Sequence, residues 1–98
     1  MLKNTPLLTK QIEAIIESSY DGIYVTDGQA NTIMVNSAYE HMTGINRDEV
    51  IGRNMRDLVQ EGFIDQSVTL KVLETGKRAT LRQKLRSGKE ILVTGNPI

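Results

Sequence analysis

Residues 21–52 have the sequence DGIYVTDGQANTIMVNSAYEHMTGINRDEVIG, and this stretch decides the fold. Two runs within it, 23–26 and 32–35, are rich in β-branched and aromatic residues, which favour extended strands. The residues between them, 27–31, are Asp-Gly-Gln-Ala-Asn, a set dominated by turn formers. Two strand-like runs joined by such a turn predict an antiparallel β-hairpin.

Two capped helical segments are expected directly after this hairpin. Either Asn36 or Ser37 is positioned to cap a helix, and Gly44 is positioned to end it in the left-handed conformation. Asn46 and Glu49 have the three-residue spacing of a capping box, which predicts a second, shorter helical turn. The stretch therefore predicts a hairpin followed by short helices.

The second half of the chain predicts a longer helix and another hairpin. Asp65 is expected to cap the helix, and Gly76 is expected to end it. Residues 78–85 alternate between an apolar and a basic face, and residues 90–96 return after a Ser-Gly turn. Strands on both sides of a helical insert are typical of the α+β class.

The composition favours one small domain in the cytoplasm. The chain has 98 residues, 12 basic and 12 acidic side chains that cancel, and no cysteine. The lack of cysteine excludes disulfides, thiolate nucleophiles and cysteine-ligated zinc. No apolar run approaches the roughly 20 residues that span a bilayer, and the N-terminus lacks the pattern of a signal peptide. We therefore expect a cytoplasmic location and no membrane association.

Neither catalysis nor direct binding of nucleic acid is expected. Asp48 and Glu49 are adjacent, so on a helix their carboxylates diverge by about 100° and do not share a substrate. No serine has a histidine partner in a motif context, and the glycines do not have phosphate-loop spacing. Arg78, Arg82 and Lys84 are explained as the solvent face of a half-buried strand, or as a face that the N-terminal helix or a dimer partner covers, and no aromatic residues are interleaved for base stacking.

Residues 1–20 predict an N-terminal amphipathic helix. Its apolar side chains recur at helical spacing and share one face: Leu8, Ile12, Ile15 and Ile16. One interpretation is that this face packs on the helix's own domain. The other is that it pairs with a second copy or relays a signal, since a narrow apolar stripe can also form a coiled coil. Fewer than three heptads do not decide between them.

The order of the predicted elements resembles a PAS domain over residues 10–98. The residues that carry the resemblance are Asp21-Gly22, Asp27-Gly28, Val35-Asn36, Thr43-Gly44, Glu49-Val50-Ile51-Gly52 and the ending Gly95-Asn96-Pro97-Ile98. The resemblance implies a PAS domain over 21–98, with an antiparallel sheet of strand order 2-1-5-4-3 and helices on one face. The fifth strand is not found in the sequence. We therefore expect a domain that is incomplete at its C-terminus, or a first strand whose edge accepts another segment or chain.

The resemblance implies a role in signalling. The chain looks most similar to PAS modules of sigma-54-dependent transcription activators, and next to those of sensor histidine kinases. The implied function is a bacterial sensory input domain that binds a small cytosolic ligand, or relays protein contacts, to an output domain. That output domain would be the ATPase of the activator or a histidine kinase. The alternative is a ligand-free PAS module that forms a homodimer.

No cofactor is expected, although a flavin- or haem-binding redox sensor stays an alternative. Flavin-binding light sensors of the family carry Gly-x-Asn-Cys-Arg, and this chain has Gly52-Arg53-Asn54-Met55-Arg56. Met55 has no thiol to add to a flavin ring, so cysteinyl-flavin photochemistry is excluded. Haem-binding members ligate iron through a histidine in the helix that corresponds to residues 66–75, which contains none. His41, the single histidine, is expected to lie near solvent.

A ligand pocket is expected between the sheet and the helices, where small-ligand sites generally form. The candidate lining residues are Tyr39, Met42, Met55, Val68, Val72 and Gln83. Gln83 breaks its local pattern because it falls on the apolar side of its strand, where an unpaired amide costs about 1–3 kcal/mol. Either a core backbone group or water pairs with the amide, or Gln83 contacts a ligand.

Overall fold

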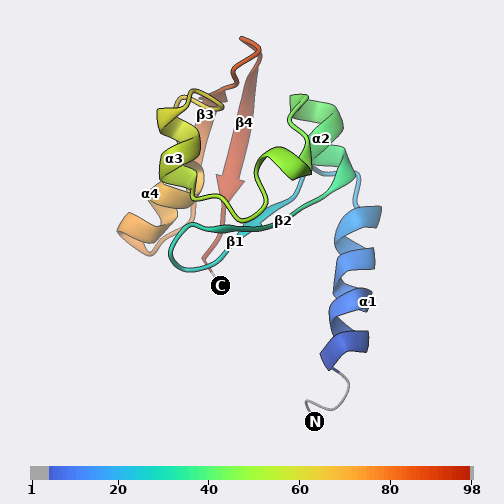
Figure 1. Ribbon diagram of the computed structural model, residues 1–98. Coiled ribbons are helices and arrows are strands. Elements are labelled where there is room, and N and C mark those ends of the chain that lie inside the picture. Colours follow the sequence, from blue (N-terminus) through green and yellow to red (C-terminus); the bar gives the residue numbers. More distant parts are fainter. Residues whose placement is uncertain (1–4, 98) are drawn as a thin grey trace.

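The computed structural model describes residues 5–97. Residues 1–4 of the predicted N-terminal segment and Ile98 of the predicted last strand lie outside the described residues. The elements, in chain order, are α1 (Thr5–Ser18), β1 (Tyr24–Thr26), β2 (Thr32–Val35), α2 (Ser37–Thr43), the 3₁₀ turn η2 (Arg47–Glu49), α3 (Met55–Gln60), α4 (Val68–Thr75), β3 (Ala79–Lys84) and β4 (Glu90–Gly95). This order confirms the α+β class (Figure 1).

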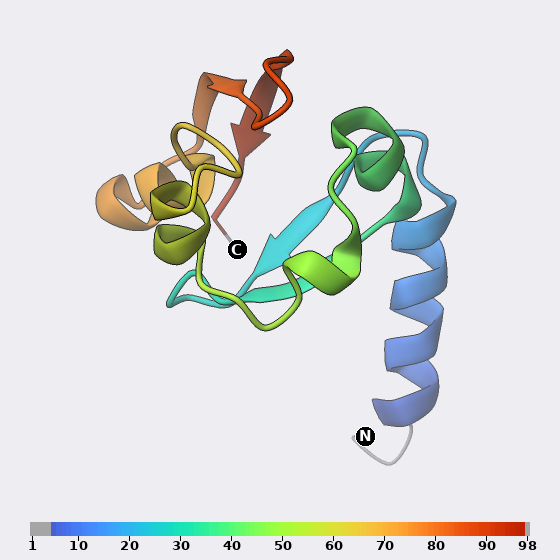
Figure 2. The same ribbon diagram turned by 45° about the horizontal axis from the view of Figure 1, so that its top comes forward.

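Both predicted hairpins are present, as two separate two-stranded sheets. In the first, Tyr24 of β1 lies opposite Val35 of β2, with an irregularity between Val25 and Thr26. In the second, β3 and β4 pair without a register shift from Ala79 opposite Gly95 onward. Figure 2 shows β3 and β4 beside α3 and α4, and β1 and β2 beside η2. Because no strand within residues 5–97 joins the two hairpins, the order 2-1-5-4-3 stays a prediction.

The helix ends follow the predicted capping residues, with one correction. Asn36 caps α2, and Gly44 ends it with φ of 73°. The prediction that Asp65 caps α4 is wrong, because α4 begins later and Ser67 is its cap, accepting from the Leu70 N–H at 3.2 Å. The carboxylate of Asp65 instead accepts a hydrogen bond from the Lys84 N–H at 2.9 Å. This bond joins the segment before α4 to the end of β3.

The core lies between the first hairpin and the helices that follow it. Its buried apolar residues are Ala30, Val35, Tyr39, Ile45, Val50, Met55, Leu58, Ile64 and Leu85. Tyr24 packs against this cluster, and its ring meets that of Tyr39 edge to face at 5.2 Å between centroids. None of the helices among residues 5–97 is long and apolar enough to cross a bilayer.

Candidate functional site

The six predicted pocket residues lie in different surroundings. Tyr39 and Met55 belong to the buried core cluster. Met42 is 40 % exposed on α2. Val68 and Val72 lie on α4 against β4, where a methyl group added at Gly95 would come within 2.9 Å of Val72 Cγ2. The pocket that these residues were predicted to line therefore stays a prediction.

Gln83 is buried on the inner face of β3, as its place in the alternating pattern predicted. The side chain is 4 % exposed, and its Nε2 donates a hydrogen bond to the Gln66 carbonyl at 3.0 Å. A backbone partner of this kind was one of the two predicted explanations for a polar residue at that position. The bond also joins β3 to the segment that leads into α4.

The core holds a short polar chain around Met55. The Tyr24 and Thr32 hydroxyls are 2.6 Å apart, and the Thr32 hydroxyl lies 4.0 Å from the Met55 sulfur. Burial raises the pKa of both Tyr24 and Tyr39, so each phenol stays neutral at physiological pH. The phenols and the thioether are polar but uncharged, and the nearby Arg53 guanidinium partly offsets the rise in the pKa of Tyr24.

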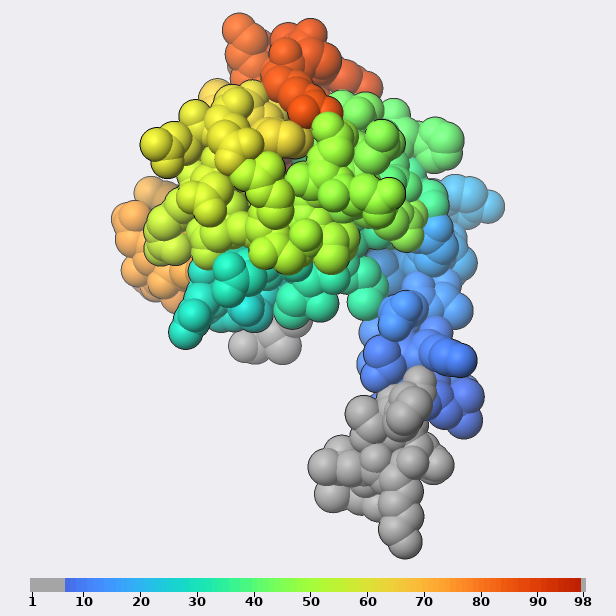
Figure 3. All heavy atoms as spheres, viewed as in Figure 1, coloured from blue at the N-terminus to red at the C-terminus, as the bar shows by residue number. Residues whose placement is uncertain are grey.

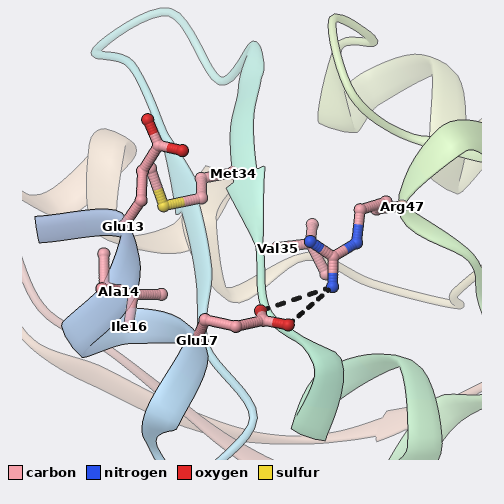
Figure 4. A pocket seen from close by; sticks show the side chains of 7 residues that line it. All are labelled: Glu13, Ala14, Ile16, Glu17, Met34, Val35 and Arg47. Carbon is pink, nitrogen blue, oxygen red and sulfur yellow. Dashed lines mark hydrogen bonds and ion pairs between the residues drawn. The ribbon is translucent and has the colours of Figure 1, made fainter. Parts of the chain in front are cut away.

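Residues 5–97 also form surface grooves, and none of the six predicted residues lines either of the two described next. A groove of about 290 Å³ lies between α1 and β2, with walls from Glu13, Ala14, Ile16, Glu17, Met34, Val35 and Arg47 (Figure 4). A second, of about 280 Å³, is bounded by Val59, Asp65, Gln66, Ser67, Leu70, Lys71, Glu74 and Leu81. The first groove lies where the N-terminal helix meets the rest of the fold.

Asn36 joins four segments at this meeting point. It is fully buried, and its Oδ1 accepts from the Tyr39 N–H at 3.0 Å and from the Ile23 N–H at 2.8 Å. Its Nδ2 donates to the carbonyls of Ile16 and Asp21, both at 2.9 Å. One side chain therefore caps α2 and also fixes the end of α1, the following linker and the approach to β1.

A charged cluster surrounds this junction on the surface. The Glu17 carboxylate accepts from the N–H of Ser37 at 3.1 Å and from its hydroxyl, and Arg47 Nη2 lies 3.3 Å from Glu17 Oε2. The same Arg47 nitrogen donates to Glu40 Oε1 at 2.9 Å. The Ser37 hydroxyl is the main cause of the lowered pKa of Glu17, and the Arg47 guanidinium is the main cause of that of Glu40.

Sequence reasoning identified Asn36 only as a helix cap and did not find this cluster. Glu17 and Arg47 are 30 positions apart, and no motif or periodicity links them. The one available signal was the capping asparagine itself. Its side-chain oxygen is used for capping, whereas its amide NH₂ group has two donor hydrogens that can bind other partners. The pairing of the two charges depends on how α1 leaves the domain.

Polar contacts also connect the second hairpin to the helices of the first half. Arg86 Nη2 donates to both carboxylate oxygens of Glu49, at 2.8 and 2.9 Å, and the guanidinium lies 4.3 Å from the centroid of the Phe63 ring. Lys89 Nζ donates to the Met42 carbonyl near the end of α2 at 2.9 Å. These contacts hold the β3–β4 turn against α2 and η2.

The residues predicted for the dimer helix lie on α1, which stands away from the rest of the fold in Figure 3. Leu8, Ile12 and Ile15 are 54, 46 and 70 % exposed. Ile16 is the one half-buried residue among positions 7–18, and it lines the groove next to β2. The interpretation that the apolar face packs on its own domain is therefore wrong for Leu8, Ile12 and Ile15.

The comparisons with known proteins agree on one family. The model of the PAS fold matches residues 10–98. A structure of the PAS domain of an HTR-like protein from Haloarcula marismortui is 22 % identical, covers 94 % of this chain and 78 % of that chain, and gives a TM-score of 0.60. A domain of a sensory box sensor histidine kinase/response regulator from Geobacter sulfurreducens is 22 % identical, with coverage of 96 and 85 % and a TM-score of 0.63. No curated protein matches the chain.

Proposed function

Since the chain belongs to the PAS family, we propose that it is the sensory input module of a larger bacterial signalling protein. In this proposal it carries no catalytic activity, acts in the cytoplasm, and passes its state to an output domain. The ATPase of a sigma-54-dependent activator and a histidine kinase are the two candidate outputs. Solved structures with the same fold include a PAS domain from a two-component sensor histidine kinase, at 19 % identity, which favours the second candidate.

The observation that carries this proposal is the junction at Asn36. A ligand shifts a conformational equilibrium only when it binds the two states with different affinity. A sensor therefore needs contacts that couple its ligand-binding interior to an element that leaves the domain. Asn36 accepts a hydrogen bond from the N–H of the core residue Tyr39 and at the same time donates one to the Ile16 carbonyl in the last turn of α1. A rearrangement of the core therefore has a short hydrogen-bonded route to α1.

The proposed ligand is a small, uncharged cytosolic molecule. Tyr24, Thr32 and Met55 form a partly buried polar chain whose own side chains carry no formal charge, and its hydroxyls can both donate and accept hydrogen bonds. Native mass spectrometry of the purified protein, followed by a thermal-shift screen of metabolites, tests the proposal. Retention of one small molecule, or a rise in melting temperature that Met55→Ala abolishes, would support it. An empty protein that no metabolite stabilises would count against it.

Visible absorption tests the cofactor alternative directly. Met55 lies where cysteinyl-flavin sensors have their cysteine, and its side chain is buried, with 5 % exposure. A buried thioether at that position removes the adduct chemistry and occupies core volume. We therefore expect a colourless preparation, and a flavin or haem spectrum would establish the redox-sensor alternative instead.

The second candidate function is that of a homodimerisation module, and the exposed stripe of α1 favours it. Isolated helices of about 12–15 residues are marginal in water, so a 14-residue helix with an uncovered apolar stripe gains stability from a partner. The charged residues next to Ile12 lie off the stripe, with Lys10 about 160° and Glu13 about 100° around the helix from Ile12. A second copy can thus approach without repulsion between like charges.

Sedimentation velocity distinguishes this candidate. We expect a concentration-dependent dimer that Ile12→Asp dissociates, whereas Lys10→Asp introduces the same side chain on the opposite face and should leave the dimer intact. A monomer at all concentrations, or equal loss of the dimer in both variants, would contradict pairing through the stripe. The half-buried Ile16 is less suitable for this test, because its substitution also disturbs the groove next to β2.

A further inference from the structure

Two different sets of polar contacts hold the C-terminal end of α1. One set comes from the fully buried Asn36 and consists of the partly buried bonds from its Nδ2 to the carbonyls of Ile16 and Asp21. The other is exposed and consists of the bonds from Ser37 and Arg47 to the Glu17 carboxylate. Figure 4 shows Glu17 and Arg47 facing each other across the groove, with the dashed contacts between them.

The exposed set is easily broken because Arg47 does not depend on it. Arg47 donates to Glu40 through Nη2 at 2.9 Å and through its backbone N–H at 2.7 Å, whereas its contacts to Glu17 are 3.3 and 3.4 Å. If Glu17 moves away, Arg47 keeps a carboxylate partner. Both side chains of the Glu17–Arg47 pair are well exposed, at 45 and 39 %, so separation buries no unpaired charge.

The rest of the chain leaves α1 free to change direction. Residues 7–15 of α1 are exposed, so no other part of the described domain covers them. The segment 19–21 between the helix and the domain has no regular secondary structure, and Tyr20 within it is 99 % exposed. Gly22 marks the end of this segment, because a methyl group there would come within 3.1 Å of the Tyr39 backbone.

We propose that Glu17, Ser37 and Arg47 form a latch that sets the direction of α1. When the latch is closed, its contacts fix the direction of α1 relative to α2, which carries Ser37, and to η2, which carries Arg47. When it opens, α1 pivots about residues 19–21 while Asn36 keeps the end of the helix attached. This inference rests on the proposed sensory function for its biological meaning, since a rearrangement of α2 or η2 would then redirect the exposed stripe of α1.

Distance measurement between two spin labels tests the latch without any ligand. The chain has no cysteine, so Lys10→Cys on α1 and Glu74→Cys on α4 can be labelled specifically. Labelled protein is mixed with an excess of unlabelled protein, which suppresses distances between copies. We expect one narrow distance distribution in this background and at least a twofold broadening after Glu17→Gln.

The matched control is Arg53→Gln. Arg53 forms an ion pair with Glu61 whose side chains are exposed to a similar degree, at 36 and 48 %, and which does not touch α1. Removal of that pair should leave the distribution narrow. A distribution that is already broad in the background, or that Glu17→Gln and Arg53→Gln leave equally narrow, would overturn the latch. Since no ligand is used, this failure is distinct from failure of the sensory proposal.

Discussion

Replacement of Asn36 by alanine should be among the most destabilising polar substitutions in this chain. The side chain makes four hydrogen bonds while fully buried. Loss of the cap on α2 costs about 1 kcal/mol. Loss of each of the other bonds costs about 1 kcal/mol, because it leaves a buried donor or acceptor without a partner. The sum is about 3–4 kcal/mol, a large part of the 5–15 kcal/mol that typically stabilises a domain.

Urea denaturation measures this loss as a change in the free energy of unfolding. Ser67→Ala is the matched control, because Ser67 is also buried and caps α4 through a single bond to the Leu70 N–H. We expect that control to lose about 1 kcal/mol. If Asn36→Ala loses no more than Ser67→Ala, the bonds to Ile16, Asp21 and Ile23 do not stabilise the fold, and the reasoning is refuted.

Asn36→Asp separates the two halves of this junction. Aspartate caps helices as well as asparagine does, so the bonds from Tyr39 and Ile23 are kept. It has no donor, however, and places a carboxylate oxygen against the carbonyls of Ile16 and Asp21. We expect a loss of about 2 kcal/mol or more despite the intact cap, from the two donor bonds alone. Wild-type stability would show that the end of α1 is not held through this side chain.

Two further predictions concern packing and pH. Gly95→Ala should destabilise the fold by about 1–3 kcal/mol, because the new methyl group would come within 2.9 Å of a Val72 methyl; Gly28→Ala meets no atom within 4 Å and should be near neutral in the same thermal unfolding assay. Hydrogen bonds lower the pKa of Glu17 and Glu40 from 4.5, so these groups stabilise the folded state above that pH. That stability is lost as pH falls through the lowered values, and urea titrations from pH 6 to pH 3 should show a decline that Glu17→Gln makes shallower.

Local sequence signals were sufficient for much of the fold. Gly44 and Gly76 end their helices with φ of 73° and 71°, as their positions after apolar periodic segments predicted. Alternation alone placed Gln83 on the inner face of β3. Asp65 failed as a cap because a tertiary partner, the Lys84 N–H, competes for its carboxylate. Caps are predicted from neighbours along the chain, whereas such competition depends on the folded arrangement.

The candidate site was less predictable for the same reason. The pocket residues were predicted from the side of the helix or strand on which each was expected to lie. That side alone does not decide whether two helices lie close enough to enclose a cavity. Met42 is an example, because it belongs to the predicted apolar side of α2 and yet is exposed near the C-terminal end of that helix. Glu17 and Arg47 carry no local signal at all. Each is an ordinary charged residue on a polar surface until the direction of α1 brings them together.

The direction of α1 therefore depends on two interactions that differ in strength and in consequence. The buried bonds of Asn36 are expensive to break and belong to the folding of the domain, whereas the exposed bonds of Glu17 are inexpensive and can open within the folded state. Because both act within one turn of α1, the end of the helix stays attached when its direction changes. A module that must transmit a rearrangement without unfolding needs this combination, and Asn36→Ala and Glu17→Gln should accordingly separate stability from helix direction.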